Sequence, residues 1–335
     1  MIILVTGSNG FVGSKLMWEL ESHGHQPLGI DISTHCDAIP HPHTMIGDIR
    51  KAVDLEAIYK TDYFPKDENI DLVIHCAASK HDFGISRQEY FSHNKYGTKE
   101  LISFMETHQI SRMIYLSTVS VFGHPKGMAD EDEAYNPDHP YGESKLAGEI
   151  LSKQWQEQDA SRELIVLRPT VIYGPHNYAN LYKLIDTLHR RPFVTVGSGS
   201  HVKAIVSLRT VLDMIFFAID KLKPGYEHFN CIDEPYISLA ELMSTIAQNP
   251  GFKVPRFKIP IGVAIAIGMI FDIPAKLFSI DLPVNSDRMR KFATSTYFTA
   301  KKIRKEGFEQ KQSIPQSLAE MCQWYLTDIK KQKHK

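Results

Sequence analysis

The sequence predicts an α/β fold, with a doubly wound parallel sheet followed by a smaller α/β C-terminal domain. Short apolar strand patterns alternate with amphipathic helix patterns as far as Leu167. Strands separated by helical stretches of this length are typical of βαβ units, whose parallel sheet carries helices on both faces. After Pro169 the alternation gives way to shorter segments separated by proline and glycine. A length of 335 residues is enough for about two domains.

The strand patterns of the first domain are short and apolar. They cover residues 1–6, 27–31, 71–76, 113–117 and 164–167. The helix patterns between them repeat apolar residues one turn apart, as Val12, Leu16 and Leu20 do in the first helix. They cover residues 11–23, 52–59, 87–108 and 142–158.

The composition argues against several classes of protein. With 38 basic and 39 acidic residues the net charge is −1, which disfavours a nucleic-acid-binding protein and gives no reason for attraction to anionic membranes. Four cysteines without a C-x-x-C pair indicate reduced thiols in a cytoplasmic protein. The H-x-H pairs at His23/His25 and His41/His43 have no nearby carboxylate or cysteine to complete a ligand set, so we expect no metal site.

The ends of the chain and its most apolar segment bear on membrane attachment. The N-terminal residues do not show the charged region and cleavage site of a signal peptide. The longest apolar run, Ile261–Phe271, has 11 residues, whereas a membrane span takes about 20. We therefore expect no integral membrane segment and interpret the run as a buried helix or a hydrophobic edge of the substrate site, with shallow membrane contact as the alternative. The basic tail is assigned to 328–335, and its last six residues, 330–335, are expected to be solvated and frayed.

Three glycines separate the first strand from the first helix. Gly7, Gly10 and Gly13 form G-x-x-G-x-x-G. Glycine is needed where the backbone meets a pyrophosphate, and the following helix offers free N–H groups and a positive dipole end to the phosphates. Asp31 ends the second strand, where a carboxylate accepts hydrogen bonds from the adenosine ribose and repels a 2′-phosphate. We therefore predict a Rossmann-type sheet that binds NAD rather than NADP.

A second pattern lies at the start of the helix expected at 142–158. Tyr141 and Lys145 form Y-x-x-x-K and lie one turn apart on one helix face. A cation beside a phenol stabilises the phenolate, which lets a tyrosine act as an acid or base nearer neutral pH than its ordinary pKa of about 10. Taken alone, the pattern also fits a surface tyrosine and a solvated lysine.

The complete series of motifs is more specific than either pattern. In chain order it reads TGSNGFVG (6–13), Asp31, GDIR (47–50), HCAAS (75–79), NKYGT (94–98), LSTVSVFG (116–123), YGESK (141–145) and LRPTVIYGP (167–175). This series resembles the extended short-chain dehydrogenase/reductase family, in its NAD-dependent epimerase/dehydratase branch. The resemblance covers residues 1–235 and returns weakly at 297–308, where Thr299 replaces the family's aspartate.

The resemblance implies roles for individual residues. Tyr141 would be the catalytic acid/base, and Lys145 would hold the nicotinamide ribose and tune Tyr141. Thr118 would hydrogen-bond the reacting oxygen, with Ser117 as a neighbouring donor. A hydride would move between a carbinol carbon and the nicotinamide while Tyr141 moves the hydroxyl proton. The residues implied to contact NAD are Gly7, Asn9, Gly10, Phe11, Val12, Gly13, Asp31, Asp48, Ile49, Cys76, Ala77, Ala78, Ser79, Asn94, Ser117, Tyr141, Lys145, Pro169 and Val171.

The resemblance also implies how the chain divides and assembles. Members of the family usually dimerise through two long helices per subunit, here the helices expected at 87–108 and 142–158, so we expect a homodimer. The expected NAD-binding domain comprises 1–171 and 205–235, and the expected substrate-binding domain comprises 172–204 and 236–327.

The two residues that follow Thr118 favour simple redox chemistry over elimination of water. The 4,6-dehydratases of this branch carry an acidic pair there, whereas this chain has Val119 and Ser120. Elimination of water would lack its acid and base. Oxidation and reduction remain, as in a 4-epimerase or a keto-sugar reductase.

The residues implied to bind substrate are less typical of the family. Lys203 stands where an arginine grips a nucleotide diphosphate, and it keeps the charge without the bidentate geometry. Ala204 and the pair Arg209–Thr210 replace family aspartates. The full set implied is Thr118, His176, Asn177, Lys203 and Arg288.

Three functions therefore stay open. The first is an NAD-dependent epimerase or reductase acting on a nucleotide-diphosphate sugar. The second is an oxidoreductase of a hydrophobic alcohol, similar to hydroxysteroid dehydrogenases, which the apolar stretch 259–275 would suit. The third is a non-catalytic NAD-sensing protein, which the presence of Thr118, Tyr141 and Lys145 disfavours.

Overall fold

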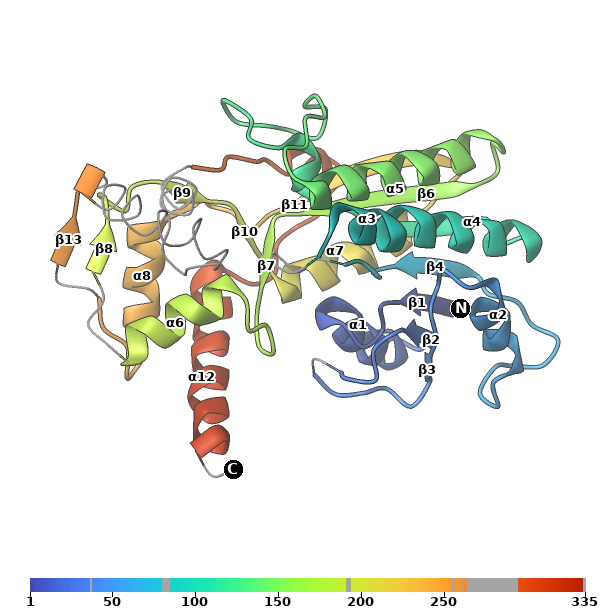
Figure 1. Ribbon diagram of the computed structural model, residues 1–335, viewed down its shortest axis with the longest axis horizontal. Helices are drawn as coiled ribbons and strands as arrows, with labels where there is room; N and C mark the ends of the chain where they lie inside the picture. The colour runs from blue at the N-terminus through green and yellow to red at the C-terminus, as the bar shows by residue number, and fades with distance from the viewer. Residues whose placement is uncertain are drawn as a thin grey trace. The chain divides into compact units, whose positions relative to one another are not determined.

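The chain forms two compact units (Figure 1). The computed structural model describes residues 1–36, 38–79, 85–190, 194–254, 257–260, 262–263 and 295–333. The first unit contains Met1–Ile172, Leu208–Ile232 and Phe298–Lys311, and the second contains Tyr173–Ser207, Asp233–Tyr297 and Gln312–Lys335.

The first unit is built on a seven-stranded sheet whose strand order is β11-β6-β5-β4-β1-β2-β3. Every neighbouring pair is parallel. The order reverses between β1 and β4, and such a switch point is where sheets of this class bind ligands at the carboxyl ends of their strands. The predicted Rossmann-type, doubly wound fold class is therefore confirmed. The strands are β1 (Ile2–Thr6), β2 (Gln26–Asp31), β3 (Thr44–Ile46), β4 (Leu72–His75), β5 (Arg112–Leu116), β6 (Glu163–Pro169) and β11 (Gly225–Cys231).

Helices cover both faces of this sheet. α1 packs beside α7, and α2 and α5 pack beside α4, with α4 and α5 running side by side in Figure 1. The region expected as one helix at 87–108 is divided by a π-helical turn, η2. The elements are α1 (Phe11–Ser22), α2 (Ala52–Glu56), η1 (Ala57–Lys60), α3 (Arg87–Phe91), η2 (Ser92–Tyr96), α4 (Gly97–Thr107), η3 (Val119–Phe122), α5 (Pro140–Glu157), α7 (Leu208–Lys221) and α11 (Lys301–Lys305).

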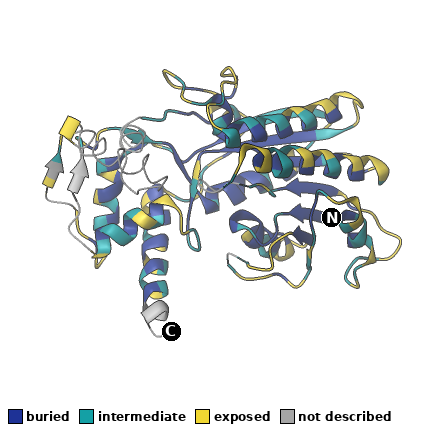
Figure 2. Ribbon diagram, in the orientation of Figure 1, coloured by how far each residue is buried: buried dark blue, intermediate teal, exposed yellow. Residues whose placement is uncertain are grey.

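The inner strands of the sheet are buried on both sides, as their dark colour in Figure 2 shows, whereas the edge strands β3 and β11 are only partly buried. Successive residues of a strand point to opposite faces, so every second residue of β1 and of β6 joins the same core. Ile2 and Leu4, together with Leu164 and Val166, pack with residues of α4 and α5 in one cluster. This rigid core holds the strand ends and the start of α5 in place.

The last part of the first unit differs from the boundaries expected from the sequence. Residues 298–311 were expected in the second domain, but they belong to the first unit. Phe298 pairs with Ala129 in a parallel β-bridge, and Asn230 Nδ2 donates to the Thr299 carbonyl at 3.0 Å. These contacts attach the returning segment to the sheet edge at β11.

The second unit has its own apolar core, in which α6, α8 and α12 pack together. Its small strands pair as β9 with β12 and as β8 with β13. α12 continues to Lys333, and Ile329 is buried against this core. The expectation of a frayed end at 330–335 is therefore wrong for residues 330–333, which are helical. The elements are α6 (Asn180–Arg190), β8 (Val194–Val196), β9 (Val202–Lys203), β10 (Ile205–Ser207), β12 (Ile237–Ser238), α8 (Leu239–Ala247), β13 (Phe257–Ile259) and α12 (Ile314–Lys333), while β7 (Val171–Tyr173) crosses the boundary between the units.

Candidate active site

The glycine-rich turn between β1 and α1 leaves room for a phosphate. Gly7 has a φ of +72°, and a Cβ there would lie 2.7 Å from the Ala77 nitrogen. A Cβ on Gly13 would collide with the Gly7 carbonyl oxygen, so α1 lies close against the turn. No side-chain hydrogen bond caps α1 at Gly10 within the described part of the chain. The start of a helix without a side-chain cap is a place where an anion can bind.

Asp31, at the carboxyl end of β2, is tied to the same turn. Its Oδ2 accepts from the Asn9 nitrogen at 2.9 Å, and its Oδ1 accepts from the Ser33 nitrogen at 2.8 Å. Asn9 Nδ2 in turn donates to the Ser33 carbonyl at 2.7 Å. The carboxylate is therefore fixed beside the turn, where the sequence expects the adenosine ribose.

Asp48 is held by a neighbour that the sequence analysis did not assign. Arg50 makes a two-pronged ion pair with Asp48, with Nε to Oδ1 at 2.9 Å and Nη2 to Oδ2 at 2.7 Å. These hydrogen bonds lower the pKa of the Asp48 carboxyl below its ordinary value. Ile49, next along the chain, is buried beside Gly97. Asp48 is thus an ionised acceptor whose orientation is set by Arg50.

The loop after β4 is joined to η2 through a buried asparagine. Asn94 Oδ1 accepts from the Ser79 nitrogen at 2.8 Å, and Asn94 Nδ2 donates to the Ser79 carbonyl at 3.1 Å. At the start of the loop, the Ala77 nitrogen donates to Thr6 Oγ1 at 3.2 Å. Burial raises the pKa of the Cys76 thiol to about 12, so this cysteine is a neutral lining residue.

The start of α5 presents Tyr141 and Lys145. Pro140 is the first helical residue, and the ring of His139 accepts from the Tyr141 nitrogen at 3.2 Å as an N-cap. The Lys145 side chain is 1% exposed, and its ammonium lies 4.2 Å from the centre of the Tyr115 ring. Burial lowers the pKa of Lys145 to about 7, and the charges of Cys76 and Glu149 partly oppose this effect.

The end of β5 supplies the predicted hydroxyls. Thr118 is 7% exposed, and its Oγ1 accepts from the Ser120 nitrogen at 3.1 Å, which caps η3. Ser117 Oγ donates to Glu149 Oε2 at 2.9 Å. The Ser117 hydroxyl is engaged with a buried carboxylate, whereas Thr118 Oγ1 donates to the neutral hydroxyl of Ser120 at 3.2 Å. Since a bond to a neutral hydroxyl is weaker than one to a carboxylate, Thr118 is the better candidate for the reacting oxygen.

Sequence reasoning missed a buried ion pair behind these hydroxyls. Glu149, one turn after Lys145 on α5, pairs with Arg168 of β6, and the two side chains are 2% and 0% exposed. Tyr135 donates to Glu149 Oε1 at 2.9 Å and accepts from Arg168 Nη2 at 2.6 Å. An arginine inside the apolar strand pattern LIVLRP was the signal that could have indicated this pair.

The remaining predicted residues are placed unevenly. Pro169 ends β6, and Val171 is 52% exposed. His176, Asn177 and Lys203 belong to the second unit, whereas the predicted cofactor and catalytic residues, with Thr118 of the predicted substrate set, belong to the first unit. Arg288 and most of the apolar run 261–271 lie outside the described residues.

The described residues fit a dinucleotide. The glycine turn is a cradle that side chains would fill, α1 begins without a side-chain cap, and Asp31 stands at the ribose end. The Lys145 ammonium is a buried donor with no hydrogen-bond partner among the described residues. A ribose hydroxyl of a bound nicotinamide nucleotide would satisfy it.

A family model agrees with this geometry. The model of the NAD dependent epimerase/dehydratase family matches residues 3–231. The chain belongs to this family. An NAD-dependent enzyme, expected from the sequence, is therefore confirmed at the level of the family.

Individual relatives of this epimerase/dehydratase show what the chain is similar to. It is 28% identical over 331 residues, or 98% of this chain and 96% of the relative, to an N-acetyl-alpha-D-glucosaminyl-diphospho-ditrans,octacis-undecaprenol 4-epimerase of Escherichia coli O157:H7. It is 27% identical over 286 residues, or 80% and 82% of the two chains, to a UDP-glucose 4-epimerase of Vibrio cholerae. A UDP-glucose 4-epimerase from Thermotoga maritima, solved with UDP-glucose, matches 98% of this chain and 100% of its own with a TM-score of 0.76 and 18% identity, which supports the fold.

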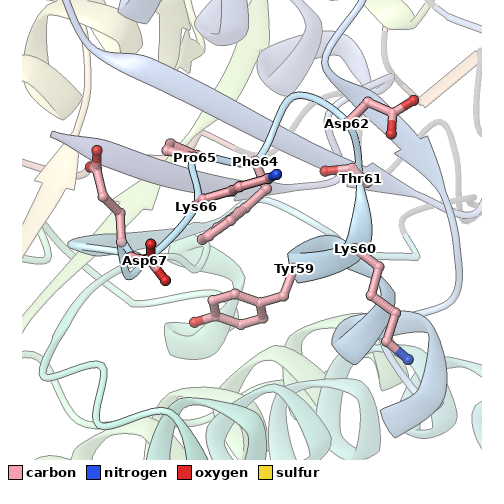
Figure 3. Close-up of a pocket in the computed structure, with 9 residues that line it drawn as sticks. Tyr59, Lys60, Thr61, Asp62, Phe64, Pro65, Lys66 and Asp67 are labelled. Atoms are coloured by element: carbon pink, nitrogen blue, oxygen red, sulfur yellow. The ribbon is translucent and has the colours of Figure 1, made fainter.

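Other features of the structure lie away from this site. A hollow of about 410 Å³ is lined by residues 59–62 and 64–68, with the Tyr59 and Phe64 rings against each other (Figure 3). It contains none of the predicted site residues. Within the described ranges there is no helix long and apolar enough to cross a membrane, and no group of three or more potential metal ligands. The cytoplasmic location and the homodimer stay predictions.

Proposed function

We propose that the protein is an NAD-dependent 4-epimerase of a sugar linked to a diphosphate, and that the carrier is a polyprenol. The similarity to the undecaprenol-linked epimerase carries this proposal, because it extends over 98% of the chain and so includes the second unit. The similarity to the Vibrio cholerae enzyme covers 80% of the chain and makes a nucleotide carrier the second candidate. Both carriers share the sugar diphosphate.

The residues of the first unit support epimerisation. NAD, when bound, supplies a hydride acceptor and returns the hydride. Tyr141 removes the proton of the sugar hydroxyl as the carbon is oxidised, and gives it back to the oxygen when the hydride returns to the other face of that carbon. Thr118 holds the reacting oxygen, and Lys145 holds the nicotinamide ribose beside Tyr141. Each proton taken is returned, so no further co-reactant is needed.

The residues after Thr118 argue against dehydration. Val119 is buried at the start of η3, and the nitrogen of Ser120 is engaged with the Thr118 hydroxyl. Neither side chain is acidic, so the site has no carboxyl group at these positions to protonate a leaving hydroxyl.

The second unit keeps one positive charge for the diphosphate. Lys203 replaces a bidentate arginine and offers a single point charge, and burial lowers the pKa of its amine. Ala204 is buried where the family has an aspartate. Because both carriers contain the diphosphate, Lys203 does not distinguish between them, and the choice of the polyprenol rests on the similarity to the undecaprenol-linked epimerase.

The test compares two carriers of the same sugar. The full-length protein with NAD is given N-acetylglucosaminyl-diphospho-undecaprenol in detergent or UDP-N-acetylglucosamine in buffer, and the sugar released by mild acid is separated by chromatography. We expect the 4-epimer from the polyprenol substrate, formed about 10²–10⁴-fold more slowly by Tyr141→Phe. If only the UDP-sugar is turned over, the carrier is a nucleotide and the polyprenol proposal is wrong. If the product has lost one water, the enzyme is a dehydratase instead.

A further inference from the structure

Ser144 is a buried hydroxyl that the proposed chemistry does not use. It lies between Tyr141 and Lys145 on α5 and is 0% exposed. Its Oγ donates to the Tyr141 carbonyl at 2.8 Å and accepts from Asn94 Nδ2 at 2.9 Å. A serine in a helix can bond its own backbone, but the second bond reaches a different element, η2.

The same asparagine reaches the loop that the sequence expects to border NAD. Its amide makes two hydrogen bonds to the backbone of Ser79, one with each backbone group. Both amide protons and the amide oxygen of Asn94 are thus engaged, and the side chain is 1% exposed. A continuous chain of hydrogen bonds runs from Ser79 through Asn94 and Ser144 to the carbonyl of Tyr141.

The contact between η2 and α5 is close. A Cβ added to Gly148 would lie 2.7 Å from the Asn94 carbonyl oxygen and would collide with the Tyr115 hydroxyl. The helices therefore approach to a distance that only glycine allows at this point. The π-helical form of η2, a form found often at functional sites, contains Asn94.

A second contact from the same segment reaches the tyrosine ring. Tyr90, one turn before Asn94, is 3% exposed. Its ring centre lies 6.2 Å from that of Tyr141, at an angle of 60° between the planes. This edge-on geometry is favourable for two aromatic rings. The α3–η2 segment thus contacts the ring of Tyr141 directly and reaches its carbonyl through Ser144.

We propose that Ser144 is a positioning residue that fixes Tyr141 relative to the cofactor loop through Asn94. The inference rests on the proposed function only for the role of Tyr141. Without the Ser144 hydroxyl, the first turn of α5 keeps its helical bonds but loses its side-chain link to η2. Substrate binding then persists, while the phenol is held less well at the reacting oxygen.

The experiment compares two serine-to-alanine variants of one helix. Ser152 is also 0% exposed on α5, and its Oγ donates to the Gly148 carbonyl at 3.0 Å, without a link to η2. We expect Ser144→Ala to lower kcat about tenfold, the effect of one neutral hydrogen bond, with the KM for the sugar within twofold. The kcat of Ser144→Cys, which keeps a weak donor and acceptor, should lie between that of Ser144→Ala and that of the wild type. Ser152→Ala should leave both constants near wild type.

A measurement without substrate separates this inference from the proposed function. Protein containing ¹³C-labelled tyrosine and bound NAD is studied by NMR, with the Tyr141 resonance assigned by its loss in Tyr141→Phe. We expect that resonance to shift or split in Ser144→Ala and to stay unchanged in Ser152→Ala. If it responds while no sugar is turned over, the proposed function fails and the positioning role stands. If Ser144→Ala matches Ser152→Ala in the spectrum and in kcat, the positioning role is refuted.

Discussion

Lys145 is a buried amine whose removal should stabilise the cofactor-free protein. Its side chain is 1% exposed, and burial lowers its pKa from 10.5 to about 7. One pKa unit corresponds to about 1.4 kcal/mol, so keeping this amine buried at pH 7 costs about 4 kcal/mol of folding stability. The change to test is Lys145→Met, which keeps the length of the side chain and its contact with the Tyr115 ring.

The sign of the pH dependence follows from the direction of the pKa change. In the unfolded chain the amine binds its proton up to about pH 10.5, whereas in the folded chain it releases the proton near pH 7. The cost is therefore complete below about pH 7 and disappears as the pH rises through 10.5. Lys145→Met should raise the free energy of unfolding by about 4 kcal/mol at pH 7 and by about 1 kcal/mol at pH 10.

The assay is urea unfolding at the two pH values, without NAD. The control is Lys153→Met on the same helix, where the side chain is 49% exposed and paired with Glu157, and where we expect a change within about 0.5 kcal/mol. A parallel NAD titration should show weaker binding by Lys145→Met, by roughly tenfold or more, because a hydrogen bond from a charged donor is lost. The reasoning is refuted if Lys145→Met is less stable than wild type at pH 7, or if its gain is equal at both pH values.

Three further outcomes are expected. Asp31→Ala should weaken the binding of NAD about tenfold and the binding of NADP less, as measured by titration with both cofactors. An equal loss of affinity for the two cofactors would show that Asp31 does not contact the ribose. Tyr141→Phe should lower turnover about 10²–10⁴-fold with NAD binding retained, and Thr118→Ala should lose less, because water can replace one neutral donor. A steady-state comparison of the two variants checks this order. His139→Ala should cost about 1 kcal/mol of unfolding free energy and His139→Asn close to none, because asparagine also caps helices; equal losses in denaturant unfolding would show that the cap contributes nothing.

The parts of the site that depend on local sequence could be predicted. The turn at Gly7 has a positive φ and lies close to Ala77. Glycine is the residue that meets both requirements, so the turn is visible in the sequence. The place of Asp31 could be predicted because it is the last residue of β2, and the carboxyl ends of parallel strands lie at one edge of the sheet. Tyr141 and Lys145 share a helix face because of the helical period, which the sequence also shows.

The parts of the fold and of the site that depend on distant contacts could not be predicted from the sequence. Phe298 returns to the first unit because it pairs with Ala129, and nothing near Phe298 in the sequence indicates that partner. The π-helical turn at 92–96 has no signature in residue spacing, because the extra residue changes the helical period only locally. The contact of Ser144 could not be predicted for the same reason, since its partner Asn94 lies 50 positions away in the chain.

The pair of Glu149 and Arg168 explains why Lys145 still has a low pKa beside a buried carboxylate. A lone carboxylate one helical turn away would favour the charged amine strongly in a buried setting. Here the carboxylate is neutralised by the guanidinium and by hydrogen bonds from Ser117 and Tyr135, so its field at the ammonium is reduced. Burial then remains the largest influence on the pKa of Lys145, with Glu149 opposing it only in part. The protein thus leaves the amine without a hydrogen-bond partner among its described residues, and a bound dinucleotide is the group that can supply one.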